Sequence, residues 1–409
     1  MSNKLAERPK IFVDKVHLKG FKSIEDVTID FKEGLNILIG KNGSGKSNFL
    51  ELMEKVLYHP RGAIIFFDYA KIILKTNDNH TFFIEIERPS RNISYRKDEI
   101  DERQYVIEKF YLDNEIIFDS SIDSMLRKPF LFKGKKFYYT SSATYALQRI
   151  GYQSISPKYI GFNLPDKLEY IATSGTFTFE IEDLLEASFD RSLNFLNSLL
   201  WSLEANIGDN AIAEAKNEII SPEKIIDLVN ESISNLLIPQ QIIIDNIRAF
   251  SPIEDLRFNK NINLYNDSKR IIVENIKLEF KINGNWMPWS QLSDGTKRLF
   301  YIISEVTYTA GLILIEEPEL GIHPHQFNLL MDFLKEQSEH KQILISTHAP
   351  KALDHLSPEE LDSILIASYD LKKGTQIRHL TSKEITKAKK YMKEVGFFSD
   401  YWTLSDLEE

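Results

Sequence analysis

Short apolar runs near both ends of the chain predict strands. Residues 11–18 and 26–31 show the alternation of apolar and polar positions that a strand with one buried face requires. Residues 35–39, 312–315 and 343–345 are almost entirely apolar, which is typical of strands buried on both faces of a parallel sheet. The pattern therefore places buried strands at both ends of a long chain.

Residues 58–140 also predict strands, here separated by polar turns. Residues 71–75 and 81–87 flank one turn, and Asp113 and Asn114 separate two further strands as in a hairpin. This arrangement predicts an antiparallel β lobe.

A basic and aromatic stretch at residues 127–139 lies within this lobe. We interpret it as a solvated strand edge that its lysines keep from aggregating. The alternative is a surface that contacts nucleic acid or the adenine of a nucleotide.

Residues 180–238 change to the period of helices. Apolar residues recur every three or four positions along 189–203 and 226–236, but each stripe is too short for a coiled-coil arm. We therefore expect a compact helical insert. Residues 241–245 and 276–282 then predict strands again.

Composition adds limits to this picture. The chain has 409 residues and no cysteine, which excludes disulfides and cysteine-based metal sites. Neither a membrane-spanning apolar run nor a signal peptide is present, so we expect a cytoplasmic protein without a membrane partner. The net charge of −10 argues against a globally basic coat for nucleic acid but permits a local basic patch.

A phosphate-binding loop follows the apolar run at 35–39. The pattern G-x-x-x-x-G-K-[ST] is matched by Gly40, Lys41, Asn42, Gly43, Ser44, Gly45, Lys46 and Ser47. The glycines let backbone N–H groups turn toward a phosphate, and the start of the predicted helix adds a favourable dipole. We expect Lys46 to reach the β- and γ-phosphates of ATP and the Ser47 hydroxyl to ligate Mg²⁺.

Residues 18–48, including Asn48 directly after this loop, resemble the N-terminal end of ABC-type ATPases of the RecF, SMC and OLD-like group. The resemblance implies an α/β P-loop NTPase fold, the ABC-ATPase head, with a mixed sheet, an antiparallel β lobe and a helical insert. It also implies a division of the chain. Residues 1–160 would form the N-terminal half of the head, 161–240 the insert, and 241–409 the C-terminal half. Asn48 is expected to belong to the nucleotide-binding residues.

Residues 292–299 resemble the signature motif of the same ATPases. Ser293 suits a helix cap, and Gly295 permits the close approach of a phosphate at the helix start. In the family this surface binds the γ-phosphate held by another protomer, which implies a homodimer or a higher oligomer. Asp294 and Thr296 depart from the common form, and an ordinary helix cap is the alternative.

The strand at 312–315 ends in the acids Glu316 and Glu317. The carboxyl end of a buried parallel strand is the usual place for ligands. The resemblance implies that Glu316 holds Mg²⁺ and that Glu317 polarises the attacking water. Most P-loop proteins use aspartate for the metal, whereas OLD-like ATPases commonly share the Glu-Glu-Pro-Glu form found here.

Three histidines near the C-terminal strands are candidates for the site. His348 follows the strand at 343–345, and its position matches the switch histidine that contacts the γ-phosphate and stabilises transition-state charge. His323 and His325 match a run near the family's dimer seam, and we expect structural or seam roles for them rather than metal binding.

These expectations describe an ATPase that dimerises on ATP and couples hydrolysis to a DNA-related task, either repair or anti-phage defence. Longer OLD-like proteins carry a nuclease domain after the switch histidine, and too little chain follows here, so we expect an effector nuclease or toxin in trans. The alternatives are the energy subunit of a membrane transporter, a small-molecule kinase and a DNA clamp without turnover. The family's Q-loop residue stays open among Gln104, Gln148 and Gln153.

Overall fold

A computed structural model of the chain divides it into two compact units. The first unit comprises Met1–Phe162, Ala310–Glu319 and Leu334–Glu409, and the second comprises Asn163–Thr309 and Leu320–Phe333. The structure describes residues 10–57, 66–88, 107–119, 129–138, most of 146–180, 241–405 except 260, 262, 268 and 269, and Leu407.

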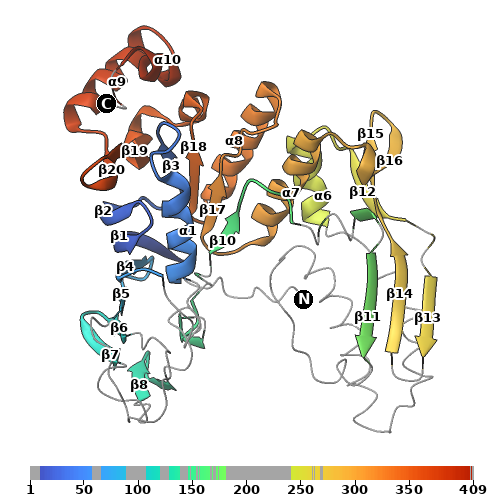
Figure 1. Cartoon of the computed structure of the whole chain (residues 1–409), viewed down its shortest axis with the longest axis horizontal. Coiled ribbons are helices and arrows are strands. Elements are labelled where there is room, and N and C mark those ends of the chain that lie inside the picture. Colours follow the sequence, from blue (N-terminus) through green and yellow to red (C-terminus); the bar gives the residue numbers. More distant parts are fainter. Residues whose placement is uncertain are drawn as a thin grey trace. The chain divides into compact units, whose positions relative to one another are not determined.

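The first unit is built on one mixed sheet. Its strands are β1 (Ile11–Phe21), β2 (Ile24–Asp30), β3 (Leu35–Ile39), β4 (Tyr69–Thr76), β5 (Thr81–Glu87), β6 (Ile107–Leu112), β7 (Glu115–Asp119), β10 (Lys158–Ile160), β17 (Ile313–Glu316), β18 (Ile343–Thr347), β19 (Ile364–Asp370) and β20 (Gly374–His379). They lie in the order β10-β17-β18-β3-β19-β20-β2-β1-β4-β5-β6-β7 (Figure 1). The first five strands are mutually parallel and the rest pair antiparallel. This order confirms the predicted mixed sheet.

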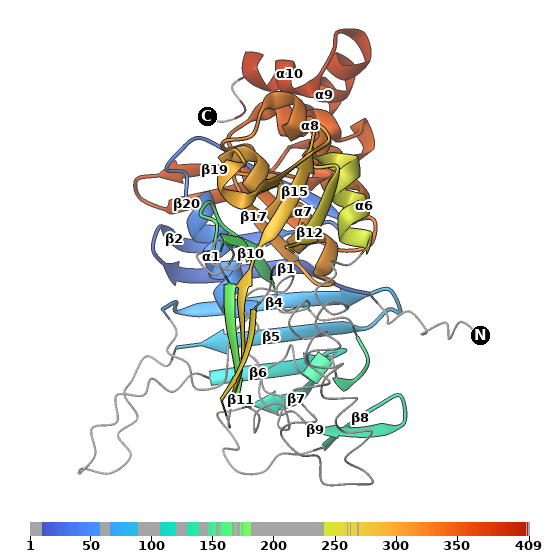
Figure 2. The same cartoon turned by 90° about the vertical axis from the view of Figure 1, so that its right-hand side faces the viewer.

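The antiparallel strands β4, β5, β6 and β7 form the predicted lobe, stacked side by side in Figure 2. Buried and partly exposed positions alternate along β4 and β5, as their apolar periodicity predicts. Asp113 and Asn114 connect β6 to β7 with φ angles of 47° and 71°. Both residues tolerate this left-handed conformation, which the tight hairpin turn requires.

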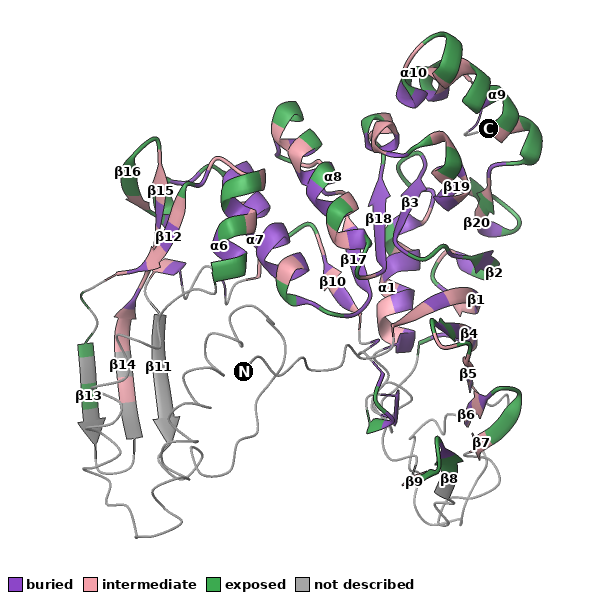
Figure 3. Ribbon diagram, turned by 180° about the vertical axis from the view of Figure 1, so that it is seen from behind, coloured by how far each residue is buried: buried purple, intermediate pink, exposed green. Residues whose placement is uncertain are grey.

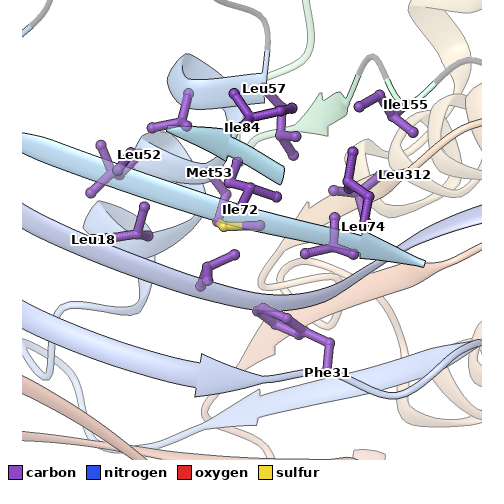
Figure 4. Close-up of a cluster of buried hydrophobic side chains, with 14 of the residues drawn as sticks. Leu18, Phe31, Leu52, Met53, Leu57, Ile72, Leu74, Ile84, Ile155 and Leu312 are labelled. Carbon is purple, nitrogen blue, oxygen red and sulfur yellow. The ribbon is translucent and has the colours of Figure 1, made fainter. Parts of the chain in front are cut away.

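The P-loop helix α1 (Lys46–Leu57) is anchored to the sheet by its apolar face. Leu52 and Met53 of α1 are fully or almost fully buried in one cluster with Ile72 and Ile84 of neighbouring strands. Figure 4 shows these side chains facing one another. This packing holds the start of α1, and with it the P-loop, against the sheet.

The basic stretch expected at a strand edge forms a separate hairpin, β8 (Pro129–Phe132) and β9 (Lys135–Tyr138). Leu131, Lys135 and Lys136 are exposed, which agrees with a solvated hairpin, while Phe132 is buried. Arg127, Lys128 and Tyr139 lie outside the described residues.

The C-terminal part of the first unit consists of a β-hairpin and short helices. The hairpin β19–β20 precedes the helices α9 (Ser382–Glu394) and α10 (Phe398–Leu404), and the short 3-10 helices η3 (Pro350–His355) and η4 (Pro358–Ser363) lie before it. Thr381 caps α9, since its side chain accepts a hydrogen bond from the backbone of Glu384.

The second unit combines helices with two small antiparallel sheets. Its elements are β11 (Gly175–Glu180), β13 (Asn263–Asp267) and β14 (Arg270–Ile276) in one sheet, β12 (Asp255–Phe258), β15 (Leu278–Ile282) and β16 (Asn285–Pro288) in the other, η2 (Trp289–Gln291), and the helices α6 (Gln241–Phe250) and α7 (Asp294–Tyr308). The helix α8 (Pro324–Ser338) begins in this unit and ends in the first.

The strand predicted at residues 241–245 is wrong, because these residues begin helix α6. Ile243, Ile244 and Ile247 are buried, the spacing of one helix face, and α6 contacts α7. The isoleucine run favours a strand locally, but burial of this face outweighs that propensity. The strand predicted at 276–282 is confirmed over Leu278–Ile282, which form β15. Ile276 instead ends β14, after Asn275, whose φ is 63°.

The two units are not consecutive segments of the chain. The second unit joins Asn163–Thr309 with Leu320–Phe333, and Ala310–Glu319, which lies between them in sequence, belongs to the first unit. The helical insert stays a prediction, because residues 181–240 lie outside the described ranges. None of the helices in the described ranges is both long and apolar enough to cross a membrane.

Candidate nucleotide site

The P-loop connects β3 to α1, as the motif requires. Gly43 and Gly45 have φ angles of 78° and 93°, a conformation that glycine adopts without a steric penalty. A Cβ atom on Gly45 would lie 1.9 Å from the Thr375 hydroxyl oxygen, so no side chain fits there. The loop thus follows a path that explains the glycines of the motif.

Lys46 begins α1 and spans the loop from within. Its Nζ donates to the carbonyl oxygens of Gly40 at 2.6 Å and Lys41 at 3.1 Å, and the residue is 6% exposed. Its ammonium group therefore lies beside the backbone that would surround the phosphates. Ser47 is exposed on the first turn of α1.

Asn48 has a structural partner. Its amide donates to the Ser23 hydroxyl at 2.7 Å, and that hydroxyl lies 2.7 Å from the Thr375 hydroxyl. Asn48 therefore ties the first turn of α1 to the segment between β1 and β2. A contact between Asn48 and a nucleotide stays a prediction.

Strand order brings distant segments to one edge of the sheet. The strand β18 lies between β3 and β17, with Ile39 paired to Thr347 and Ser346 paired to Glu316. All three strands are parallel, so their carboxyl ends share this edge. The P-loop, Glu316, Glu317 and His348 therefore follow strand ends of the same region.

Glu317 lies in a strained turn at this edge. Its φ is 42°, a left-handed conformation that costs a residue with a Cβ about 1–2 kcal/mol. Its backbone N–H donates to the Ser346 carbonyl at 2.8 Å, which holds the turn. Strain of this kind gathers at functional sites, where it directs a side chain.

His348 lies between two carboxylates. Its Nδ1 is 3.6 Å from Glu317 Oε1 and 3.3 Å from Glu319 Oε1. The structure thus brings together the two residues that the sequence predicts for water activation and charge stabilisation.

Glu319 is a site residue that the sequence reasoning did not select. Its Oε1 accepts hydrogen bonds from the Thr347 hydroxyl at 2.6 Å and from the His348 backbone at 3.1 Å. Its side chain is 11% exposed, so these bonds fix the switch segment to a largely buried carboxylate. The sequence does contain a sign of this role, because Glu319 belongs to the same acidic run as Glu317, with Pro318 between them.

Three buried polar atoms around this edge have no hydrogen-bond partner among the described residues. They are the hydroxyl oxygens of Ser44 and Ser346 and Oε2 of Glu319. Buried polar atoms are ordinarily bonded, so the edge suits a polar ligand such as a nucleotide phosphate.

Mg²⁺ fits this donor set. Glu316 is half-buried at the end of β17, and Ser47 is exposed at the start of α1. Within the described ranges, no three histidine or acidic side chains gather as a protein-only metal site would require. Mg²⁺ typically binds one or two carboxylates together with substrate phosphates, which the Ser47 and Glu316 pair beside a P-loop would permit.

The predicted signature residues lie in the second unit, at the start of α7. The Ser293 hydroxyl accepts from the Thr296 backbone at 3.2 Å and is the helix cap, and Ser293 is exposed. Gly295 is buried, and a Cβ atom there would lie 2.3 Å from the Gly321 carbonyl oxygen. Close packing within the unit therefore requires this glycine. Binding of a phosphate by Ser293 and Gly295 stays a prediction.

The remaining candidates are two histidines at the start of α8 and three glutamines. His323 Nδ1 accepts from the His325 backbone at 3.3 Å, and the structural or seam role expected for both histidines stays a prediction. Gln104, Gln148 and Gln153, the Q-loop candidates, are outside the described ranges.

Comparison with known proteins gives a family. Residues 35–354, more than half of the chain, match the AAA_21 family model, described as "AAA domain, putative AbiEii toxin, Type IV TA system". The "Retron Vc95 probable ATPase" of Vibrio cholerae serotype O1 biovar El Tor is 22% identical over 90% of this chain and 76% of its own length.

Two further relatives are similar over different spans. An "ATP/GTP phosphatase" of Helicobacter pylori is 20% identical over 84% of this chain and 87% of its own length. The "DNA replication and repair protein RecF" of Desulfitobacterium hafniense is 53% identical, but over 9% of this chain and 10% of its own length. The chain belongs to the AAA_21 family and is an ABC-type P-loop ATPase of the RecF, SMC and OLD-like group.

Proposed function

We propose that this chain hydrolyses ATP to ADP and phosphate in a Mg²⁺-dependent reaction and that ATP joins two copies of it. The observation that carries the proposal is the strained Glu317 beside His348, at the sheet edge where the P-loop begins. A carboxylate held next to a histidine there suits activation of water for attack on a γ-phosphate.

Each group has a defined task in this proposal. Lys46 would contact the β- and γ-phosphates, and Ser47 and Glu316 would hold Mg²⁺. When bound, Mg²⁺ neutralises charge on the phosphate oxygens. Glu317 would accept a hydrogen bond from the attacking water and orient it, and His348 would stabilise the developing charge.

The other protomer would complete the site. In related ATPases the signature surface binds the γ-phosphate of the facing P-loop, and the exposed cap residue Ser293 suits that contact. ATP would stabilise the closed dimer because its γ-phosphate contacts exist only there, and hydrolysis would release the two copies.

We propose DNA as a partner, with the α9 helix as its contact. Figure 3 shows α9 largely in green, the colour of exposed residues. By helical spacing its lysines, all exposed, lie around the side opposite the buried Ala388: Lys383, Lys387, Lys389, Lys390 and Lys393. Four of them form no ion pair with a described residue, and Lys390 lies 4.0 Å from Glu394. Such a face suits the phosphate backbone of DNA, as the name of the RecF relative also suggests.

The biological setting we propose is DNA repair or defence against phage, with a separate effector nuclease or toxin. The retron ATPase relative and the AbiEii toxin in the family description support the defence setting. Co-purification of the tagged chain from its native host tests it. Absence of both DNA and an effector from the purified dimer would contradict this part of the proposal.

Phosphate release by the purified chain tests the central activity. Release of phosphate from ATP that requires Mg²⁺ and stops with a chelator is the expected result. A chain that binds ATP but releases no phosphate under any Mg²⁺ concentration would contradict hydrolysis.

A further inference from the structure

Strand β10 places a tyrosine beside the predicted metal carboxylate. The strands β10 and β17 pair parallel, with Tyr159 opposite Leu314 and Ile160 opposite Ile315. Glu316 is two residues beyond Leu314, so its side chain shares a sheet face with that of Tyr159. The Tyr159 hydroxyl donates to Glu316 Oε2 at 2.5 Å.

Gly161, which has no side chain, leaves space for the ring of Tyr159. Continuing the register by one residue sets Gly161 opposite Glu316. A Cβ atom on Gly161 would lie 3.1 Å from Cε1 of Tyr159, tighter than most contacts of real Cβ atoms. A side chain at this position would crowd the ring, so the glycine permits the diagonal contact with Glu316.

The surroundings of this hydroxyl favour its protonated form. Tyr159 is half-buried, and burial raises the pKa of its hydroxyl well above the usual range. The hydrogen bond to Glu316 and the charges of Glu316, Glu54 and Glu51 raise this pKa further. A phenol hydroxyl is a hydrogen-bond donor near neutral pH without any such shift, so the contact with Glu316 rests on the geometry of the pair.

We propose that Tyr159 is a positioning residue for the metal site. Its hydroxyl donates to Oε2 of Glu316 and so fixes the orientation in which that carboxylate meets Mg²⁺. The proposal rests on the proposed function, in which Glu316 holds Mg²⁺. Carboxylates that bind metals are commonly oriented by such hydrogen bonds, and loss of one typically weakens metal binding about 10–100-fold.

The contact also gives a reason for glutamate at position 316. Aspartate is one methylene shorter, so its carboxylate would withdraw from the Tyr159 hydroxyl. In Glu316→Asp, the carboxylate that meets Mg²⁺ would therefore no longer be oriented by Tyr159.

The first measurement is the Mg²⁺ dependence of binding of a fluorescent ATP analogue to the full chain. Tyr159→Phe keeps the ring and removes the hydroxyl, and we expect the Mg²⁺ concentration for half-maximal binding to rise about tenfold or more. Binding in the presence of a chelator should be unchanged, which a general loss of structure would not allow.

Tyr152→Phe is the matched control. The Tyr152 hydroxyl also donates to a carboxylate in the first unit, that of Asp78 at 3.0 and 3.1 Å, away from the strand ends of the site. Its removal should leave the Mg²⁺ dependence unchanged. If Tyr159→Phe does not fold, Gly161→Val replaces it, because the added side chain displaces the ring; the same rise in Mg²⁺ requirement is expected.

A double-mutant cycle completes the test. In a Glu316→Asp background, Tyr159→Phe should change the Mg²⁺ requirement by less than about twofold, because the shortened carboxylate no longer accepts from the Tyr159 hydroxyl and that contact is already lost. Two results would overturn this inference and leave the proposed function standing. One is a folded Tyr159→Phe variant with the same Mg²⁺ dependence as the unaltered chain. The other is a Tyr159→Phe effect that adds in full to that of Glu316→Asp. If Mg²⁺ does not strengthen binding of the analogue by the unaltered chain at all, the proposed function is overturned as well.

Discussion

At the scale of single residues, the site depends on side chains held by a strained turn and by buried hydrogen bonds. The left-handed backbone of Glu317 and the two bonds that Glu319 accepts from the Thr347 hydroxyl and the His348 backbone are the clearest cases. A strained residue persists only where surrounding contacts over-determine it. Substitutions here should therefore alter catalysis more than they alter folding.

Glu317→Gln should reduce phosphate release about 10²–10⁴-fold, because an amide does not act as the base that a carboxylate supplies. ATP binding should persist, since the P-loop is unchanged. Single-turnover phosphate release and binding of a fluorescent ATP analogue measure the two effects. Glu33→Gln, an exposed acid in the turn before β3, is the control and should keep full activity.

Glu319→Gln should lower phosphate release about 10–100-fold, the range set by hydrogen bonds to charged groups. The effect acts through His348, whose backbone and ring both meet this carboxylate. His348→Ala combined with Glu319→Gln should therefore be no slower than His348→Ala alone. Two effects that multiply would show that Glu319 acts independently of the histidine.

At the scale of elements, α9 combines a capped start, a buried side and a lysine-covered side. Lys383, Lys387 and Lys390 are spaced by four and three residues and so share one face of the helix. Several lysines on the sheet of the first unit instead pair with acids on neighbouring strands, as Lys15 does with Asp30 and Lys19 with Asp26. The difference makes α9 the element that we expect to meet a polyanion.

Replacing Lys383, Lys387 and Lys390 by alanine should weaken DNA binding similarly for all sequences. The slope of the logarithm of DNA affinity against the logarithm of salt concentration should fall in magnitude by about 1 for each lysine that no longer neutralises a phosphate. Titration of fluorescent DNA at several salt concentrations measures both.

Lys15, Lys19 and Lys75 are the matched control set, because each forms an ion pair on the sheet. Their replacement by alanine should leave DNA binding nearly unchanged. Equal weakening by the two triple variants would indicate attraction to overall charge and would contradict a site on α9.

At the scale of the whole molecule, the predicted catalytic groups and the signature residues belong to different units. Glu317 and His348 lie in the first unit, and Ser293 lies in the second. In the proposed dimer, each reaction centre takes Glu317 from one copy and Ser293 from the other.

This sharing predicts complementation. Glu317→Gln and Ser293→Arg should each lack activity alone, yet a mixture should recover about a quarter of the unaltered rate. Random pairing makes about half of the dimers mixed, and each mixed dimer of this symmetry has one intact site of two. Phosphate release from mixed purified variants is the measurement, and no recovery above the separate variants would contradict a shared site.

The sequence by itself determined the elements whose information is local. The P-loop glycines, the apolar strands β3, β17 and β18, the Asp113–Asn114 turn and the Ser293 cap all follow from patterns within a few residues. These patterns suffice because backbone conformation, strand burial and helix capping depend on near neighbours.

Only the tertiary structure decided which distant residues meet. Residues 241–250 became a helix through packing against α7, against their local strand propensity. Glu319 meets His348, and Tyr159 meets Glu316 across 157 positions, because strand order places β10 and β18 on either side of β17. No short pattern encodes strand order, since it depends on how the whole sheet buries its apolar faces.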